Sequence, residues 1–386
     1  MTLIQFNNSF DKAGFLSSYW QQKPLLIKQM LPNFSDPISP EELAGLSMEL
    51  GTESRLVEGV DPAHWQMSEG PFTEERFTSL PQDGWTLLVQ AVDHWVEEVQ
   101  ELMQLFDFVP SWRIDDVMVS FAAHGAGVGP HYDYYDVFLI QGLGQRTWKI
   151  GKKCSSADVT SNRAGLSILE QFEEVEEITL QTGDVLYIPP QYSHWGVSDG
   201  RSLCYSVGCR APSLAEMIEG FSDTLIDNAL PEDRYTDPMP QAPTKRGEIA
   251  LGNVEESFNK LMELIDSKSN YCIWFGCNTT RPKYPNLIVA PEQDYTIESL
   301  IQELAEGCSL VMNPSSRFAF CPLPCTEITA LFVDGECAQL SNELSWFAQA
   351  MCDQSLLKQF ISKLLETPKA LDHTLRYLNQ GSLVTY

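Results

Sequence analysis

The stretch GPHYDYYDVFLIQGLGQRTWKIG, residues 129–151, places two metal-binding side chains directly before an apolar run. His131 and Asp133 are two residues apart, and the apolar run begins at Val137. Residues two apart on a strand point to the same face, so both side chains can be directed at one point. Because the chain has only 6 histidines, a histidine beside an acid at the start of a strand is a candidate ligand.

A second stretch, GDVLYIPPQYSHWG (residues 183–196), supplies a third candidate, His194. The pattern predicts a strand, a Pro-Pro-Gln turn and then the histidine over the mouth of a barrel. Two imidazoles and one carboxylate form the facial triad of non-haem Fe(II) oxygenases, which leaves open positions for a co-substrate and O2. The alternative is that His131 caps a strand and His194 lies on the surface. The two stretches together favour the metal site, and His124 in AAHGAGVG is interpreted as a loop residue.

An open Fe(II) site requires a source of electrons, and 2-oxoglutarate supplies two of them. Its keto-acid end chelates the metal, so its distal carboxylate needs a cation. Arg146, on the strand RTWKIG, is the candidate, since arginine binds a carboxylate bidentately. Lys149 is the other candidate cation, but it is three residues from Arg146, so on a strand the two side chains point to opposite faces and only one of them can point inward. A surface arginine on a barrel strand is the alternative.

The composition is that of a globular protein with a sizeable core. The chain has 386 residues, 43% of them hydrophobic and 20% charged, with a net charge of −28. The length predicts two or three domains. The acidity disfavours direct nucleic-acid binding and is suited either to solubility alone or to a basic protein partner.

The termini and cysteines indicate a cytoplasmic protein with reduced thiols. The first twenty residues lack the basic start and apolar run of a secretory signal, and no stretch is apolar enough to predict a membrane span. The 10 cysteines are scattered, and the spacings of Cys272/Cys277 and Cys321/Cys325 differ from the C-x2-C motif of structural zinc sites.

The pattern of residue types, and with it the expected secondary structure, changes along the chain. Short strands rich in Val, Ile, Tyr and Phe, punctuated by Gly, Pro, Asn and Asp, fill residues 112–210 and predict a sandwich or small barrel. Residues 213–230 have apolar side chains at helical spacing, a Pro-rich loop covers 231–247, and a second helix is expected from Val254. Helices and a small hairpin follow from residue 281, which is the pattern of a winged-helix-like module.

These motifs resemble the bacterial JmjC-domain ribosomal oxygenases. The resemblance rests on HYDYYDVFLIQGLGQRTWKIG, GDVLYIPPQYSHWG, YSVGCRAP and the N-terminal FLSSYWQQKPLLI, and is close over residues 1 to about 230. It implies an α+β protein: a JmjC/cupin-type double-stranded β-helix with flanking helices over 1–212 (core about 100–212), a helical dimerisation region over 213–280 that makes a homodimer, and a winged-helix-like domain over 281–386.

The resemblance also implies the reaction and the roles of the residues. Fe(II), 2-oxoglutarate and O2 would hydroxylate an arginine at Cβ in a basic protein of the large ribosomal subunit. By motif, His131, Asp133 and His194 match the iron ligands, and Ser120 and Arg146 match the 2-oxoglutarate contacts. The departure is the loop AAHGAGVG, where a plainer Gly/Pro run is expected.

Substrate contacts are expected on the strand that carries Ser120. Met118 and Asp116 share its face while Asp115 points away, so Asp116 is the acid placed to bind a guanidinium, and Ser206 on a later strand could add an acceptor. The alternative is that Asp116 only ties the strand to a loop. At the level of function, hydroxylation of histidine or asparagine, demethylation, and an inert metal-binding cupin-like protein stay open.

Overall fold

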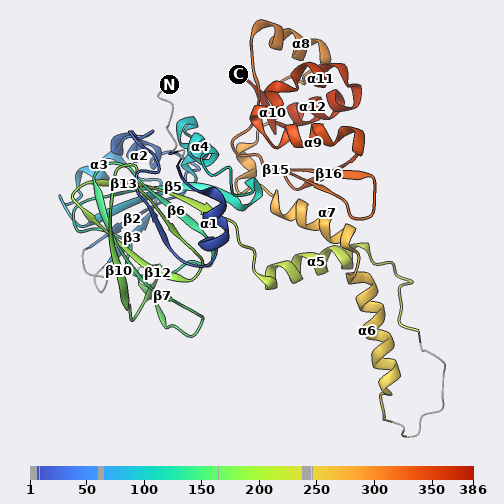
Figure 1. The fold of residues 1–386 in the computed structure, drawn as a ribbon, viewed down its shortest axis with the longest axis horizontal. Helices are drawn as coiled ribbons and strands as arrows, with labels where there is room; N and C mark the ends of the chain where they lie inside the picture. The colour runs from blue at the N-terminus through green and yellow to red at the C-terminus, as the bar shows by residue number, and fades with distance from the viewer. Residues whose placement is uncertain (1–6, 8, 60–64, 164, 237–244, 246) are drawn as a thin grey trace. The chain divides into compact units, whose positions relative to one another are not determined.

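The computed structural model describes residues 7, 9–59, 65–163, 165–236, 245 and 247–386. The chain separates into two compact units, Met1–Ala211 and Pro212–Tyr386 (Figure 1). Most of the predicted Pro-rich loop, residues 237–244 and 246, lies outside the described residues. Among the helices that the structure describes, none is long and apolar enough to cross a membrane.

The larger sheet of the N-terminal unit has eight strands in the order β1-β11-β6-β13-β5-β4-β2-β3, all antiparallel to their neighbours. Their bounds are β1 (Leu25–Ile27), β2 (Ser54–Glu58), β3 (Gln66–Glu69), β4 (Trp85–Val89), β5 (Ile114–Ala122), β6 (Val137–Gln141), β11 (Val185–Ile188) and β13 (Ser202–Cys209). The strands before residue 100 extend the sheet beyond the region that the sequence predicted as strands.

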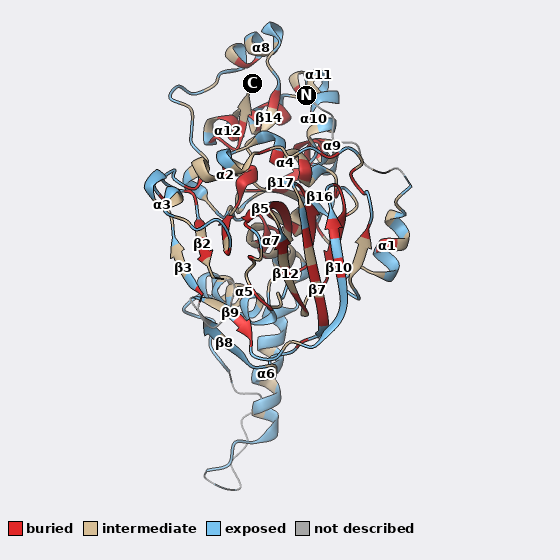
Figure 2. Ribbon diagram, turned by 90° about the vertical axis from the view of Figure 1, so that its left-hand side faces the viewer, coloured by how far each residue is buried: buried red, intermediate tan, exposed pale blue. Residues whose placement is uncertain are grey.

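A smaller sheet, β10-β7-β12, faces the larger one. It consists of β7 (Gln145–Lys153), β10 (Glu174–Gln181) and β12 (Tyr192–Asp199), and a hairpin of β8 (Thr160–Arg163) and β9 (Leu166–Leu169) lies between β7 and β10 in the chain. The acidic run at 173–177 is solvated, as expected, and Figure 2 shows β10 exposed along most of its length. His194 follows the strand β11 and the Pro189-Pro190-Gln191 turn, as the sequence predicted, and it lies within the next strand, β12.

The strands of the larger sheet bury both of their faces. In β6, Val137 and Leu139 pack toward the smaller sheet, while Phe138 and Ile140 join the cluster on the opposite face. This period of two sorts the side chains of each strand into two layers. The face toward the smaller sheet therefore becomes the interior of a double-stranded β-helix, which is the fold expected from the sequence.

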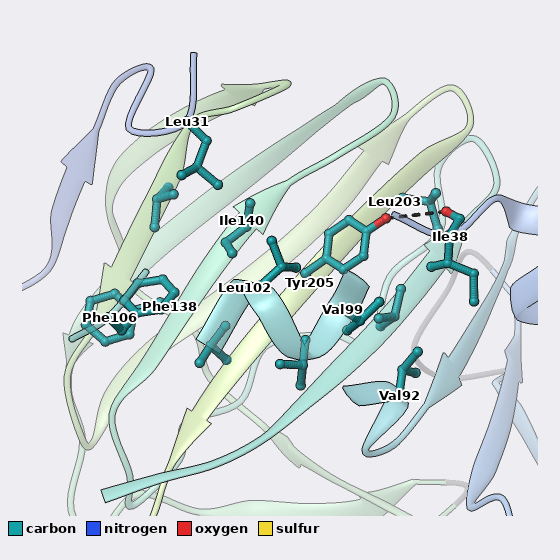
Figure 3. Close-up of a cluster of buried hydrophobic side chains, with 14 of the residues drawn as sticks. Leu31, Ile38, Val92, Val99, Leu102, Phe106, Phe138, Ile140, Leu203 and Tyr205 are labelled. Atoms are coloured by element: carbon teal, nitrogen blue, oxygen red, sulfur yellow. Dashed lines mark hydrogen bonds between the residues drawn. The ribbon is translucent and has the colours of Figure 1, made fainter. Parts of the chain in front are cut away.

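Helices cover the outer face of the larger sheet. They are α1 (Lys12–Ser18), α2 (Pro40–Leu46), α3 (Glu74–Thr78) and α4 (Glu97–Gln104), with short 3-10 turns at Val92–His94 and Ser111–Arg113. Figure 3 shows Val99 and Leu102 of α4 beside Ile140 and Tyr205 of the sheet. The buried Tyr205 hydroxyl is satisfied because it donates to the backbone oxygen of Ile38 at 3.4 Å and the carboxylate of Asp36 at 3.0 Å.

The C-terminal unit combines helices with two small sheets. Its helices are α5 (Leu214–Asn228), α6 (Leu251–Ile265), α7 (Lys268–Thr279), α8 (Ile297–Glu306), α9 (Ser345–Met351), α10 (Gln354–Gln359), α11 (Ile361–Glu366) and α12 (Pro368–Gln380), with a 3-10 turn at Pro285–Leu287 and another at Asn342–Leu344. Its strands are β14 (Leu310–Met312), β15 (Phe318–Pro322), β16 (Ile328–Val333), β17 (Glu336–Ser341) and β18 (Leu383–Thr385). The sheets are β15-β16-β17 and β14-β18. The helix expected from Val254 begins earlier, at Leu251, where Ala250 is its N-cap.

Candidate metal centre

A reciprocal pair of backbone hydrogen bonds joins the loop before β6 to strand β12. His131 N–H donates to the backbone oxygen of His194 at 3.1 Å, and His194 N–H donates to that of His131 at 2.8 Å. Gln191 N–H donates to the backbone oxygen of Asp133 at 2.6 Å, so the loop is held at a second point. These bonds place three side chains that are far apart in the sequence around one point.

The three candidate ligands converge. Asp133 Oδ2 lies 3.9 Å from His131 Nε2 and 3.7 Å from His194 Nε2. Within the described residues, this is the single group of three His, Cys, Asp or Glu side chains whose ligand atoms lie within 4.8 Å of one another. Adjacent ligands on an octahedral ion, at bond lengths of about 2.1 Å, are about 3 Å apart. Closure around an ion therefore needs only small side-chain movements.

Both histidines are held in the tautomer that binds a metal through Nε2. The Nδ1 of His131 lies 2.9 Å from the backbone oxygen of Gly129, and that of His194 lies 3.0 Å from the backbone oxygen of Tyr192. A carbonyl oxygen only accepts, so each neutral ring carries its proton on Nδ1 and leaves the Nε2 lone pair directed at Asp133.

The His194 imidazole is kept neutral by its surroundings. Burial lowers the pKa of His194 to about 4, and the neighbouring His131 acts in the same direction, whereas Asp133 opposes the shift. A metal requires the unprotonated ring, so this shift keeps the ligand available at neutral pH.

Arg146 places a buried positive charge on the interior face of β7. Its guanidinium is buried and donates to Ser120 Oγ at 3.0 Å and to Ser202 Oγ from two nitrogens, at 3.0 and 3.3 Å. Among the described residues, no carboxylate pairs with it, and burial lowers its pKa. Lys149 lies on the other face and binds Glu174 at 2.9 Å. The parity prediction for Arg146 and Lys149 is confirmed.

The space between Arg146 and the ligands is lined by an indole. The ring of Trp148 lies 5.9 Å from the ring of His194, and the Arg146 guanidinium lies 6.0 Å from the indole. The Trp148 Nε1–H is buried, and no described residue accepts a hydrogen bond from it. Gly196 is needed here, because a Cβ on it would lie 2.8 Å from the indole. An unsatisfied donor and a cation without an acid together suit a bound anion.

Asp116 and Met118 lie on the same interior face of β5 as Ser120, as the alternation predicts. Asp116 is buried and accepts from Gln90 Nε2 at 2.8 and 2.9 Å, whereas Asp115 accepts from Arg210 Nε at 2.8 Å. Ser206 of β13 is the direct register partner of Met118. The three candidate substrate contacts are therefore neighbours on adjacent strands.

The sequence analysis missed Tyr135, Gln90 and Ser202. The Tyr135 hydroxyl bonds Asp133 and lies near Asp116, and burial together with these acids raises its pKa. The signal that could have found it is parity, since it follows Asp133 by two residues. Gln90 and Ser202 carry no local signal, because each reaches its partner across a different strand. His124 is exposed and accepts from Gly200 N–H at 3.1 Å, so it belongs to a surface turn.

The comparisons with known proteins agree with this geometry. The model of the JmjC domain matches residues 101–217, and that of the ROXA-like winged helix matches residues 263–384. The ribosomal protein uL16 3-hydroxylase of Escherichia coli (strain K12) is 39% identical over 308 residues, which are 80% of this chain and 82% of the relative. The chain belongs to the JmjC-domain ribosomal oxygenases. This family consists of Fe(II)- and 2-oxoglutarate-dependent enzymes that consume O2.

Other ribosomal oxygenases support the same placement. A probable ribosomal oxygenase of Haemophilus influenzae is 34% identical over a stretch that covers 65% of this chain and 63% of the relative's chain. The X-ray structure of E. coli YcfD has a TM-score of 0.88 at 32% identity and covers 99% of this chain and 100% of that one. A YcfD structure in complex with cobalt and 2-oxoglutarate has a TM-score of 0.85 at 32% identity, with 99% of each chain covered.

Removal of one candidate ligand should weaken metal binding strongly while the fold persists. For His131→Ala and Asp133→Ala we expect the affinity for Co(II) to fall by more than the roughly 10–100-fold typical of losing an outer-shell partner. Titration calorimetry measures the affinity, and circular dichroism checks the fold. His124→Ala is the matched control, since that histidine is close in sequence but bonded elsewhere. Wild-type affinity in either ligand variant would contradict the assignment.

Proposed function

We propose that this ribosomal oxygenase hydroxylates the Cβ of an arginine in the large-subunit protein uL16, using Fe(II), 2-oxoglutarate and O2. The observation that carries the proposal is the buried Arg146 without an acid partner, on the same interior face as a two-histidine, one-carboxylate cluster. The name of the E. coli relative, a uL16 3-hydroxylase, supports the substrate and the position, since carbon 3 of an amino acid is Cβ. The cytoplasm, where ribosomes are assembled, is the proposed place of action.

The donor set fits Fe(II). His131, Asp133 and His194 would hold the ion on one face and leave positions open for the keto-acid end of 2-oxoglutarate and for O2. When bound, the ion supplies the oxidising chemistry that couples decarboxylation of 2-oxoglutarate to succinate with insertion of oxygen into a C–H bond. The residues of this chain orient the two substrates and exclude water.

Arg146 and its neighbours inside the barrel would bind the distal carboxylate of 2-oxoglutarate. Arg146 offers a planar fork of donors, which Ser120 and Ser202 already hold in one orientation. Trp148 Nε1–H is a further donor available to a carboxylate. Because the cation is fixed before the co-substrate arrives, little ordering is needed on binding.

The opposite end of the interior face would bind the arginine. Asp116 is held by Gln90 with its carboxylate in place, and Met118 and Ser206 lie beside it. A guanidinium matches a carboxylate bidentately, and the methionine would pack against the aliphatic part of the side chain. Tyr135, between Asp133 and Asp116, would form part of the same wall.

Peptides that cover ribosomal protein uL16 test the proposal directly. With Fe(II), 2-oxoglutarate and O2, the purified protein should add the mass of one oxygen atom to one arginine, and fragmentation should place it on Cβ. Asp133→Ala is the inactive control. Oxygen on a histidine or asparagine would overturn the residue assignment, and formaldehyde release from a methylated peptide would indicate demethylation. Metal binding without succinate formation would support the inert cupin-like alternative.

Arg146→Ala should raise the KM for 2-oxoglutarate far more than the KM for peptide. Loss of one partner of a buried charge pair costs about 2–5 kcal/mol, which corresponds to roughly 30-fold or more in affinity. Lys149→Ala, on the same strand with its side chain on the other face, should leave both KM values unchanged. The measurement is succinate formation over a range of co-substrate concentrations. An effect of Lys149→Ala in place of Arg146→Ala would show that the wrong face was assigned.

Asp116→Ala should lose peptide hydroxylation while slow, uncoupled decarboxylation of 2-oxoglutarate continues. The reason is that the acid contacts the arginine and not the co-substrate. Asp115→Ala, its neighbour paired with Arg210, should be mild by comparison. Hydroxylated peptide and succinate are assayed side by side for both variants. Normal hydroxylation by Asp116→Ala, or a reversal of the two phenotypes, would contradict the guanidinium contact.

We also propose that residues 213–280 form a homodimer interface, and that α6 is its centre. Apolar side chains repeat along α6 at alternating steps of three and four residues, and all are exposed or half-exposed in the single chain: Leu251, Val254, Phe258, Leu261 and Ile265. This is the spacing of a coiled-coil seam, which buries itself against a second copy. α5 adds exposed Leu214, Ile218 and Ile226.

Phe258→Asp should convert the dimer to a monomer. A charge at the centre of an apolar seam would be buried without a partner, which is strongly unfavourable. Light scattering at micromolar concentration gives the mass. Val175→Asp, on the exposed strand β10, is the control and should remain dimeric. A wild-type protein that is monomeric at this concentration would contradict the proposal.

A further inference from the structure

Four of the ten cysteines surround one apolar cluster in the C-terminal unit. Cys272 and Cys277 lie on α7, Cys321 lies on β15 and Cys337 lies on β17, and all four are half-exposed. The cluster is centred on the buried residues Leu323, Ala330 and Phe332. None of these thiols belongs to the metal centre, which lies in the other unit.

The strand register brings both sheet cysteines to the face that α7 covers. Cys321 is the direct partner of Ala330, and Cys337 is the direct partner of Phe332. Directly opposed residues share a face, and residues 330 and 332 of β16 point to the same side. The two sheet cysteines therefore lie on either side of the central strand, facing the helix that carries the other two.

Gly276 allows α7 to approach the sheet closely, and the turn at Gly335 contacts the end of the same helix. A Cβ on Gly276 would lie 2.3 Å from the ring of Phe332, so only glycine fits at that position. Gly335, in the turn before β17, donates its N–H at 3.2 Å to Oγ1 of Thr280, the residue that caps the end of α7. A Cβ on Gly335 would lie 3.7 Å from the backbone oxygen of Cys277. The turn that precedes Cys337 thus rests against the helix just where Cys277 lies.

The close approach sorts the four thiols into two pairs. The neighbouring thiols affect one another's pKa: Cys277 and Cys337 do so mutually, Cys321 raises the pKa of Cys272, and Cys272 adds to the rise in the pKa of Cys337. Within the first pair the interaction with Cys337, assisted by the Arg281 guanidinium, lowers the pKa of Cys277, whereas the pKa of Cys337 is raised. In the second pair, burial raises the pKa of Cys272 to about 12. The Arg281 guanidinium favours the thiolate of Cys277, and since the thiolate is the nucleophile, Cys277 is assigned as the attacking thiol.

The arrangement does not favour a structural metal. Thiolates on a tetrahedral zinc ion lie about 3.8 Å apart, from Zn–S bonds of about 2.3 Å. In the part of the chain that the structure describes, no group of three such thiols lies within 4.8 Å. Thiols that face each other across the contact between a helix and a sheet are suited to a disulfide instead.

We propose that Cys277 and Cys337 form a reversible disulfide that fastens α7 to the sheet β15-β16-β17. With a peroxide as the oxidant, the Cys277 thiolate attacks one oxygen, breaks the O–O bond and becomes a sulfenic acid. The Cys337 sulfur then displaces that hydroxyl as water and forms the S–S bond. In sum, two thiols and one hydrogen peroxide give one disulfide and two waters, and a dithiol reductant reverses the step.

The disulfide would connect two parts of the unit through one helix. On its other side, α7 packs Tyr271 and Trp274 against Phe221 of α5, with ring centroids 5.1 and 5.5 Å apart. Fastening α7 to the sheet would therefore restrict how α5 and the sheet move relative to each other. Oxidation would act on the C-terminal unit while the residues of the metal centre stay unchanged.

The test oxidises the reduced full-length protein with hydrogen peroxide and digests it without reductant. Mass spectrometry should find the peptides of Cys277 and Cys337 joined within one chain, with separation after dithiothreitol. Cys277→Ser and Cys337→Ser should lose the link, and Cys325→Ser, which removes an exposed thiol, should keep it. Oxidation should also raise the midpoint of thermal unfolding in the wild type but not in Cys277→Ser.

Three results would overturn the proposal. The first is that both thiols remain open to alkylation after Cys325 is oxidised. The second is that Cys277 proceeds to sulfinic acid without a link. The third is that the protein as isolated holds a zinc ion that a chelator removes as these thiols become reactive.

Discussion

The reciprocal backbone pair between His131 and His194 is the constraint on which the candidate site depends. Two ligands separated by a long stretch of chain are brought together by main-chain hydrogen bonds, which are independent of the side chains that they position. The imidazoles are therefore free to turn their Nε2 atoms to one point, and the carbonyls of Gly129 and Tyr192 fix that orientation. A metal ion would need only small side-chain movements to complete its binding by these ligands.

The interior of the barrel has an electrical polarity that suits two substrates of opposite charge. Arg146 lies at one end without an acid, and Asp116 lies at the other, held by the neutral Gln90. In the proposed function, the acidic co-substrate would be attracted to the first and the guanidinium to the second, so each would be kept from the place of the other. The overall acidity of the chain would then favour the approach of the proposed basic substrate.

Strand periodicity accounts for most of what the sequence could predict. Parity showed that Arg146 and Lys149 lie on opposite faces of their strand and that Asp116 and Asp115 do so on theirs, and the preference of arginine for carboxylates selected Arg146 as the inward one. It could not reveal which strands would become neighbours, so Ser202 and Gln90 were missed, as was the backbone pair that joins the two histidines. Strands β2–β4 were also missed, because the alternation of their buried and exposed side chains is recognisable only when β4 is seen to pair with β5. The alternation within a strand predicts which face a side chain points to. The partner of that side chain depends on which strands become neighbours, and the local sequence does not show this.

If Arg146 binds 2-oxoglutarate as proposed, it would also make the stability of the fold depend on a metabolite. A cation held away from water without a counter-charge is a cost that the folded protein bears until an anion arrives. A ligand that binds only the folded form stabilises it by about 2.7 kcal/mol when present at 100 times its dissociation constant. With a dicarboxylate bound to Arg146, the N-terminal unit would resist unfolding and proteolysis more strongly as the concentration of that acid rises, with a stabilisation that grows with the logarithm of the concentration. The lifetime of the protein in the cell would thus follow the level of a central carbon metabolite, even when no ribosomal protein is being modified.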